Sequence, residues 1–268
     1  MSTRGFFDSD SERIYFECWG DADEAVILVH GMGGSHAVWY QQVAFLAPRY
    51  RVVTWDQRGF GRSSRISGDI GPGPAVGDLE RLLDHLGIDR AHIVGQSMGG
   101  WCALGFAIAY PDRTISLVLA DSTAGIFTKQ VRRTLDDYGR GVADGPPPEE
   151  WPLGLHPAIG TQLYDDDLAQ SFLYTQLGSL TEPPSPMAII PLLMATDHTE
   201  RVARVSAPTL FIVGENDPIF PPSLIEPITG FIDGSKVAIV ENTGHSPYFE
   251  RPDLWNDIVA GFLAQSAP

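Results

Sequence analysis

The sequence contains little cysteine, little lysine and no long apolar run. Its 268 residues include two cysteines, Cys18 and Cys102, which lie far apart and do not have the close spacing of metal ligands. Two cysteines also cannot form the set of bridges that stabilises small secreted domains. We therefore expect both to be small buried apolar side chains. The sequence also shows no phosphate-binding loop and no dinucleotide fingerprint, so we expect neither a metal nor an organic cofactor.

Targeting and membrane segments are also missing from the sequence. No stretch reaches the roughly 18 apolar residues of a membrane span. The first ten residues lack the apolar run that a secretory signal requires. We therefore expect a cytoplasmic protein that has no membrane partner.

Positive charge is scarce as well. The 18 lysines and arginines face 34 aspartates and glutamates, for a formal charge of −16, and only Lys129 and Lys236 are lysines. A strongly negative surface argues against nucleic acid and anionic membranes as partners. A small-molecule substrate is the expected partner, and self-association into a homo-oligomer stays open.

Short apolar runs recur along the chain, each ending where glycine or polar residues begin. Continuous runs of four to six apolar residues indicate strands buried on both faces, as in a mainly parallel sheet. We expect strands over Arg13–Trp19, Ala25–Val29, Tyr50–Trp55, Ala91–Val94, Ile115–Leu119, Thr209–Val213 and Lys236–Val240.

Helical segments lie between these runs. Residues Asp78–Leu86 have apolar side chains at spacings of three and four and are followed by Gly87, which predicts a helix that ends at that glycine. Further helices are expected over Gly99–Tyr110 and Asp253–Leu263. The alternation of strands and helices indicates an α/β sheet with helices on both faces.

Residues 123–206 interrupt this alternation. They contain two proline-rich stretches and helical patches but no strand-like run. The segment is too long for a loop and has no evident core of its own. We expect residues 1–122 and 207–268 to form the core domain, and residues 123–206 to form a helical cap, or lid.

The strongest local motif is GQSMGG, from Gly95 to Gly100, which joins an expected strand to an expected helix. In a G-x-S-x-G turn a strained backbone exposes the serine hydroxyl, and the glycines let strand and helix approach closely. Ser97 is therefore the candidate nucleophile. The alternative is a glycine-rich turn whose serine only caps the next helix.

A serine hydroxyl needs a base to take its proton. His245 follows the last expected strand, at a carboxyl end, where open α/β sheets place their sites. It is therefore the candidate general base. His85, His92, His156 and His198 are more simply structural histidines.

The base in turn needs an acid that fixes its tautomer. Asp217 and Glu215 both follow the strand over Thr209–Val213, and Asp217 is favoured because it lies deeper in the turn. Asp121, after the preceding strand, is the alternative acid.

Backbone N–H groups can bind the oxyanion that forms on the substrate. The N–H of Met98 follows the nucleophile directly. The HGMGG segment supplies the N–H of Met32 as the second candidate donor. The alternative for this segment is a plain strand–helix turn whose Ser35 caps the next helix.

Five segments in chain order, HGMGG, DQRGFGRS, GQSMGG, GENDP and TGHSPYFERP, resemble the single-cap branch of the α/β-hydrolase family. The resemblance covers nearly the whole chain outside residues 123–206. It implies an eight-stranded, mostly parallel sheet flanked by helices, with a helical cap inserted after the sixth strand. GQSMGG and DQRGFGRS are most similar to 3-oxoadipate enol-lactone hydrolases and related small-ester hydrolases.

Aromatic residues are the candidates for the pocket wall, although such residues are also common in cores. The candidates are Trp39, Trp101, Phe127, Trp151 and Tyr248.

The sequence thus predicts a serine hydrolase that cleaves a small carboxylic ester or lactone through an acyl-enzyme. Three alternatives stay open. One is hydrolysis of a carbon–carbon bond in a vinylogous diketone. Another is lyase, acyltransferase or perhydrolase chemistry on the same scaffold. The third is a ligand receptor that hydrolyses slowly.

Overall fold

A computed structural model describes residues 2–145, 150, 158–179 and 182–266. The chain forms one eight-stranded sheet of order β1-β2-β4-β3-β5-β6-β7-β8. Strands β1 and β2 pair antiparallel, β2 also runs antiparallel to β4, and all other neighbouring pairs are parallel. The mostly parallel α/β sheet expected from the sequence is therefore confirmed. The strands are β1 (Thr3–Ser9), β2 (Glu12–Trp19), β3 (Ala25–Val29), β4 (Arg51–Trp55), β5 (Ala91–Gln96), β6 (Thr114–Ala120), β7 (Thr209–Gly214) and β8 (Lys236–Val240).

All seven predicted strands are present, and β1 is the one that the apolar pattern did not identify. In β1, only Phe7 and Ser9 are buried, so the segment has no continuous apolar run. The expectation of burial on both faces was wrong for β8, whose Val237 and Ile239 are exposed, because β8 is the edge of the sheet.

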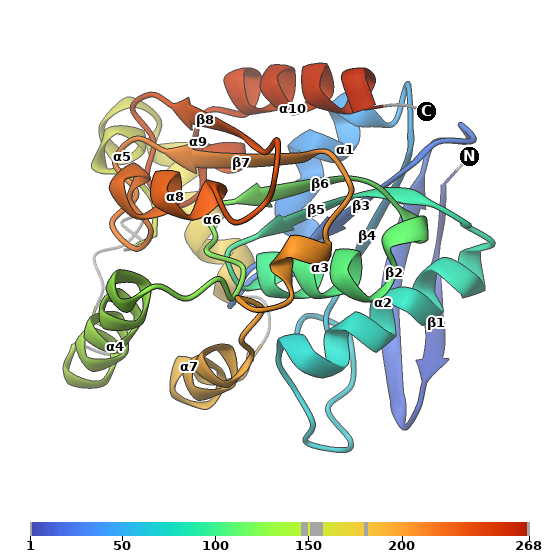
Figure 1. The fold of residues 1–268 in the computed structure, drawn as a ribbon, viewed down its shortest axis with the longest axis horizontal. Helices are drawn as coiled ribbons and strands as arrows, with labels where there is room; N and C mark the ends of the chain where they lie inside the picture. The colour runs from blue at the N-terminus through green and yellow to red at the C-terminus, as the bar shows by residue number, and fades with distance from the viewer. Residues whose placement is uncertain (1, 146–149, 151–157, 180–181, 267–268) are drawn as a thin grey trace.

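Helices cover both faces of the sheet (Figure 1). Contacts place α1 and α10 on one face and α2, α3 and α8 on the other. The predicted helix that ends at Gly87 is confirmed, because α2 ends there with Gly87 in the left-handed conformation. These helices are α1 (Tyr40–Leu46), α2 (Pro72–Leu86), α3 (Met98–Ala109), α8 (Pro222–Thr229) and α10 (Pro252–Ser266), with the short α9 (Pro247–Glu250) before α10.

The core consists of two apolar layers, one on each face of the sheet. Successive side chains of a strand point to opposite faces. Accordingly, Ile27 and Val29 of β3 join the layer under α2 and α3, whereas Val26 and Leu28 join the layer under α1 and α10. The sheet is thus anchored on both sides, and its carboxyl edge is held in a fixed position.

Residues 123–206 enter the chain between β6 and β7, after the sixth strand. We call these residues the inserted segment. Its helices lie at one end of the molecule, beside the carboxyl ends of the strands (Figure 1). They are α4 (Lys129–Asp144), α5 (Thr161–Asp166), α6 (Leu168–Ser179) and α7 (Pro186–Ala195).

In the part of the chain that the structure describes, no helix combines the length and the apolar character needed to cross a membrane.

Candidate active site

Ser97 lies in the tight turn between β5 and α3. Its backbone has φ 49° and ψ −120°, a region that residues other than glycine seldom adopt. Two backbone bonds hold it there: the Ser97 N–H donates to the carbonyl of Ala120 at 2.8 Å, and the Gly100 N–H donates to the Ser97 carbonyl at 2.8 Å. The surrounding fold therefore imposes the strained backbone conformation of Ser97, which places its side chain at the end of the sheet.

The glycines on either side of Ser97 allow this turn to pack. A Cβ on Gly95 would lie 2.4 Å from the carbonyl oxygen of Gly99, and one on Gly99 would lie 2.3 Å from that of Val29. Both distances are below any real contact, and the obstructing atoms are backbone. The spacing of the motif is thus a packing requirement of this strand–turn–helix unit.

His245 lies in the loop after β8, with its imidazole buried. Its Nδ1 is 2.8 Å from Oδ2 of Asp217, which follows β7. The His245 N–H donates to the carbonyl of Ala158 at 2.9 Å, and its carbonyl accepts from Nε2 of Gln96 at 2.9 Å. Asp217 therefore orients the ring, and the two backbone bonds fix the position of the residue that carries it. Ser97 and His245 line the same cavity. In the described structure, no direct hydrogen bond joins the Ser97 hydroxyl to the imidazole.

Asp217 is fixed by its own turn. Its Oδ1 accepts the N–H groups of Ile219 and Phe220 at 2.8 and 3.0 Å, so Oδ2 is directed at His245. Glu215, the other carboxylate of this turn, is exposed and accepts the N–H of Asn242 at 3.0 Å. Of the two, Asp217 contacts the imidazole.

Asp121, the alternative acid, lies beside this pair. It is fully buried at the end of β6, and its Oδ1 accepts the N–H of Gly214 at 2.9 Å. Burial, followed by the nearby charge of Asp217, raises the pKa of Asp121 well above its usual range. Burial therefore favours the protonated, uncharged form of Asp121.

Asp121, Asp217 and His245 are also the one group of described residues with ligand atoms close enough for a metal ion, all within 4.8 Å. His245 Nδ1 and Asp217 Oδ2 are hydrogen-bonded to each other, and Oδ1 of Asp121 accepts the Gly214 N–H. Oδ2 of Asp121 is buried and has no hydrogen-bond partner among the described residues.

Met32 and Met98, the candidate oxyanion donors, both line the same cavity. Met98 is the first residue of α3, where helix N–H groups lack intrahelical partners. Met32 lies in the turn after His30. Neither N–H donates to a protein acceptor within the described ranges.

His30, whose role the sequence did not indicate, stabilises this turn through hydrogen bonds of its imidazole. Its Nε2 accepts the Gln57 N–H at 3.0 Å and its Nδ1 donates to the Gly31 carbonyl at 2.8 Å, while burial lowers its pKa. A neutral His30 can make both bonds.

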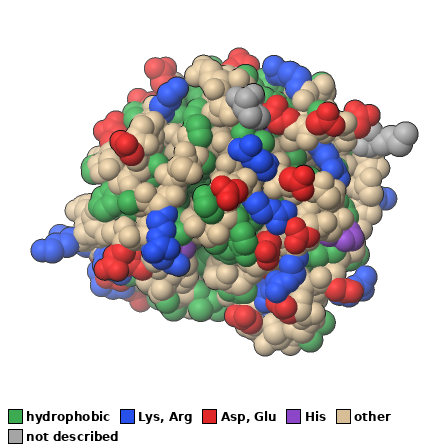
Figure 2. Space-filling view, turned by 45° about the vertical axis from the view of Figure 1, so that its right-hand side comes forward, with side chains coloured by type: hydrophobic (Ala, Val, Ile, Leu, Met, Phe, Trp, Pro, Cys, Tyr) green, Lys and Arg blue, Asp and Glu red, His purple; other side chains and the backbone are tan. Residues whose placement is uncertain are grey.

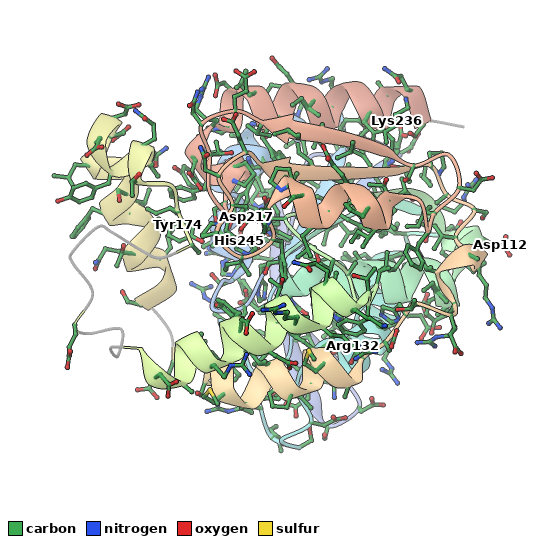
Figure 3. The ribbon with its side chains drawn as sticks, turned by 60° about the vertical axis from the view of Figure 1, so that its left-hand side comes forward. Asp112, Arg132, Tyr174, Asp217, Lys236 and His245 are labelled. Atoms are coloured by element: carbon green, nitrogen blue, oxygen red, sulfur yellow. The ribbon has the colours of Figure 1, made fainter. Side chains whose placement is uncertain are left out.

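Ser97 and His245 face a cavity of about 500 Å³. Its walls come from the sheet edge and from the inserted segment, which contributes Leu135 and Tyr138 of α4, Tyr174 of α6 and Ile190 of α7. Figure 3 shows Asp217 and His245 side by side, with Tyr174 next to them. The inserted segment therefore helps to form the site.

The aromatic residues predicted for the pocket divide into three groups. Trp101 and Tyr248 line the cavity. Trp39 does not: it packs in the core against Tyr248 and Trp255, at ring-centre distances of 4.6 and 6.0 Å. Phe127 lies outside the wall, with the Arg132 guanidinium over its ring. Trp151 lies outside the described residues.

Glu250 is a further residue that the sequence did not single out, although it lies within the TGHSPYFERP motif. Its carboxylate accepts the N–H groups of Gly160, Gly244 and Ser246 at 2.9, 2.8 and 3.1 Å. It thereby joins the His245 loop to the inserted segment. Tyr174, for which no sequence signal existed, adds a 2.7 Å bond between its hydroxyl and that of Ser246.

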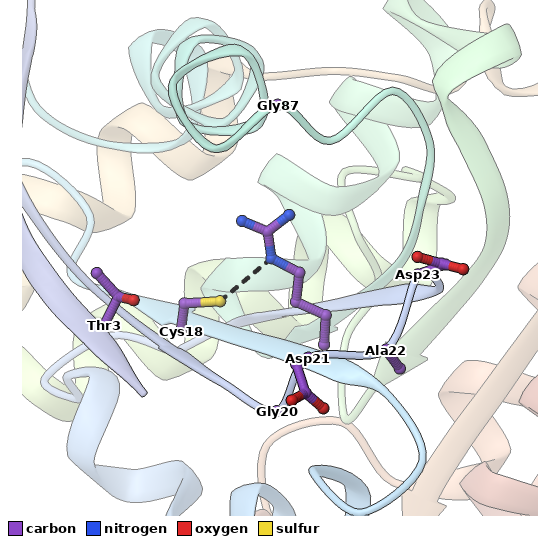
Figure 4. Close-up of a pocket in the computed structure, with 8 residues that line it drawn as sticks. Thr3, Cys18, Gly20, Asp21, Ala22, Asp23 and Gly87 are labelled. Carbon is purple, nitrogen blue, oxygen red and sulfur yellow. Dashed lines mark hydrogen bonds between the residues drawn. The ribbon is translucent and has the colours of Figure 1, made fainter. Parts of the chain in front are cut away.

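A second hollow, of about 410 Å³, lies at the opposite, amino-terminal ends of β3 and β4 (Figure 4). Arg51 provides its cationic group, but its Nε contacts Sγ of Cys18 at 3.3 Å and its Nη2 donates to the Leu86 carbonyl at 2.9 Å. Because these donors already have protein partners, we do not assign a ligand to this hollow.

The chain belongs to the α/β-hydrolase fold family, which it matches over residues 24–252, and it is a hydrolase. It is 30% identical over 250 residues to 3-oxoadipate enol-lactonase 1 of Acinetobacter baylyi, covering 89% of this chain and 88% of the relative. It is 29% identical over 266 residues, 94% and 95% of the two chains, to a protein of Azorhizobium caulinodans named for a proposed carbamate hydrolase activity, RutD.

Among solved structures, a thermophilic esterase from Thermogutta terrifontis is similar over 99% of this chain and 100% of its own. The TM-score is 0.83 and the sequence identity is 27%. The architecture thus extends over the whole chain, the inserted segment included.

Proposed function

We propose that Ser97, His245 and Asp217 form a catalytic triad that hydrolyses a small carboxylic ester or lactone through an acyl-enzyme. The observation that carries this proposal is the buried 2.8 Å contact between His245 Nδ1 and Asp217, in the cavity that Ser97 lines. The names of the three similar proteins support it, because carbamate, enol-lactone and ester hydrolysis all break a bond between an acyl carbon and a heteroatom.

In the proposed mechanism, Ser97 attacks the substrate carbonyl and its proton passes to Nε2 of His245. Asp217 keeps the second proton on Nδ1 and stabilises the imidazolium. The N–H groups of Met32 and Met98 donate to the oxyanion.

The acyl–oxygen bond then breaks, and the departing alcohol oxygen takes the proton from His245. In a lactone this oxygen stays attached to the acyl chain. A water deprotonated by His245 then cleaves the acyl-enzyme, which releases the acid and restores Ser97.

Stopped-flow hydrolysis of p-nitrophenyl acetate tests the proposal. We expect a burst of p-nitrophenol that matches the enzyme concentration, and a loss of at least about 10³-fold in kcat/KM for Ser97→Ala. Ser223→Ala, at an exposed position of α8, is the matched control and should retain wild-type activity.

Equal rates for Ser97→Ala and the wild type would refute the mechanism. Faster turnover of a vinylogous diketone than of every ester and lactone would assign the same residues to carbon–carbon bond cleavage.

A further inference from the structure

The cavity wall is mainly hydrocarbon. Away from Ser97 and His245, apolar side chains from five parts of the chain face the same space. They are Met32, Val38, Met98, Trp101, Leu135, Pro183, Pro184, Pro186, Ile190, Leu193, Ile219 and Phe220. A ligand that fills the cavity is therefore removed from water on most of its surface.

Four polar side chains of the wall are bonded within the protein, whereas the indole N–H of Trp101 has no hydrogen-bond partner among the described residues. Gln96 donates to the His245 carbonyl, Thr175 to the Ser171 carbonyl and Ser179 to the Gln176 carbonyl. Tyr174 is bonded to Ser246. These groups therefore have little hydrogen-bonding capacity left for a charged ligand.

The described wall also contains no lysine or arginine. The arginines of α4, the helix that supplies Leu135 and Tyr138, are exposed and face outward. Arg132 pairs with Asp197 at 2.6 Å, while Arg133 and Arg140 pair with Asp137. By sequence, residues 146–157 and 180–181 contain no lysine or arginine either.

From this wall we infer that the site takes uncharged substrates, in which an apolar acyl group or ring surrounds the reacting carbonyl. It discriminates against substrates that carry a second, ionised carboxylate. This inference rests on the proposed function and narrows its substrate class.

The physical basis is desolvation. An ionised carboxylate moved from water into an apolar cavity loses its hydration, and only a partner cation or several donors can compensate for that loss. The net charge of −16 also disfavours the approach of anions to the protein.

Three p-nitrophenyl esters of matched chain length test this inference: the hexanoate, the monoester of adipic acid, and the same adipate with its distal carboxyl methylated. All have a six-carbon acyl chain, and only the monoester is charged. We expect kcat/KM for the methylated adipate to lie within about tenfold of the hexanoate. The charged monoester should be at least about 100-fold slower, mainly through KM, because of the cost of burying a charge.

A charge introduced into the wall provides the reciprocal experiment. Thr175 is half-buried on α6 and lines the cavity, so a longer side chain there can be accommodated. Thr175→Lys should raise the ratio of adipate monoester to hexanoate activity at least about tenfold, whereas the neutral Thr175→Met should leave that ratio unchanged.

The outcomes separate the two proposals. Hydrolysis of charged and neutral esters at similar rates, lost in Ser97→Ala, would overturn the substrate inference and leave the proposed function standing. Absence of Ser97-dependent hydrolysis of all three esters would overturn the proposed function and this inference with it.

Discussion

Two residues that directly follow strands of the sheet have backbone conformations that side chains seldom adopt: Ser97 after β5, with φ 49°, and Asp121 after β6, with φ 48°. Each is fixed by a bond to the neighbouring strand. The Ser97 N–H donates to Ala120 and the Asp121 N–H donates to Ile212, both at 2.8 Å. Such strain persists only where the surrounding structure imposes it, and here it marks the same sheet edge as the candidate site.

The two aspartates near His245 should respond differently to the same substitution. Asp217→Asn replaces the acceptor of the Nδ1 proton by an amide that can favour the wrong imidazole tautomer. We expect kcat/KM for a p-nitrophenyl ester to fall by about 10²- to 10⁴-fold. Asp121→Asn keeps an oxygen for the Gly214 N–H and gains an amide that can donate to Asp217, so a loss of less than about tenfold is expected.

Steady-state kinetics of both variants at one pH check this prediction, with circular dichroism spectra to establish folding. If Asp121→Asn lost as much activity as Asp217→Asn, or more, the acid would have to be assigned to Asp121.

At the scale of elements, the sequence predicted best the strands that are buried on both faces. The continuous apolar runs over β3, β5 and β7 identified strands because both faces of these strands are covered. In contrast, β1 escaped prediction because only part of it is buried, and β8 was predicted with the wrong burial because it is an edge. Short-range patterns do not state where an element lies in the sheet.

The candidate site shows the same contrast between features set by local sequence and features set by packing. Ser97, His245 and Asp217 follow β5, β8 and β7, so strand ends and turn motifs were sufficient to locate them. Trp39 was placed in the pocket wrongly, because whether an aromatic side chain faces a cavity or the core depends on packing between distant elements. For the same reason, the contacts of Glu250 and Tyr174 with the His245 loop could not be predicted from the sequence.

Glu250 connects two elements that meet only in the folded chain. One carboxylate holds three backbone N–H groups, one of them in the inserted segment and two in the loop that carries His245. Such charge-assisted bonds are stronger than neutral ones. The position of the imidazole is therefore coupled to the position of the inserted segment.

Glu250→Gln should weaken this coupling, because an amide presents one oxygen and one NH₂ group where three N–H donors converge. We expect kcat to fall by about 10- to 100-fold and Tm to fall by several degrees. The control is Glu226→Gln, at an exposed position of α8.

Kinetics and thermal unfolding measured together check this prediction. If Glu250→Gln lowered Tm but left kcat at the wild-type value, Glu250 would support the fold without positioning His245.

At the scale of the whole molecule, charge is unequally distributed between surface and interior. Acidic and basic side chains are interspersed on the face shown in Figure 2, where solvent screens them. Inside, burial raises the pKa of Asp121 and of Glu250 and lowers the pKa of His30, His92 and His198. These five groups bind protons differently in the folded and unfolded chains.

Two opposing contributions should therefore make the stability of the protein depend on pH. Below about pH 6.5 the unfolded chain gains protons on histidines that the folded protein keeps neutral, so stability is lost as the pH falls. The raised pKa of Asp121 and Glu250 acts in the opposite direction. Their contribution is fully present below about pH 4, the pKa range of unfolded carboxyls, and is lost as the pH rises towards the folded values.

Asp121→Asn isolates one of these contributions. Because the amide does not ionise, the variant should gain stability relative to the wild type by about 1.4 kcal/mol per pH unit above pH 4, until the folded pKa of Asp121 is reached. Urea unfolding of both proteins between pH 5 and pH 8 measures this difference, and Asp112→Asn, at an exposed position, serves as the control. A difference that does not change with pH would mean that folding does not raise the pKa of Asp121.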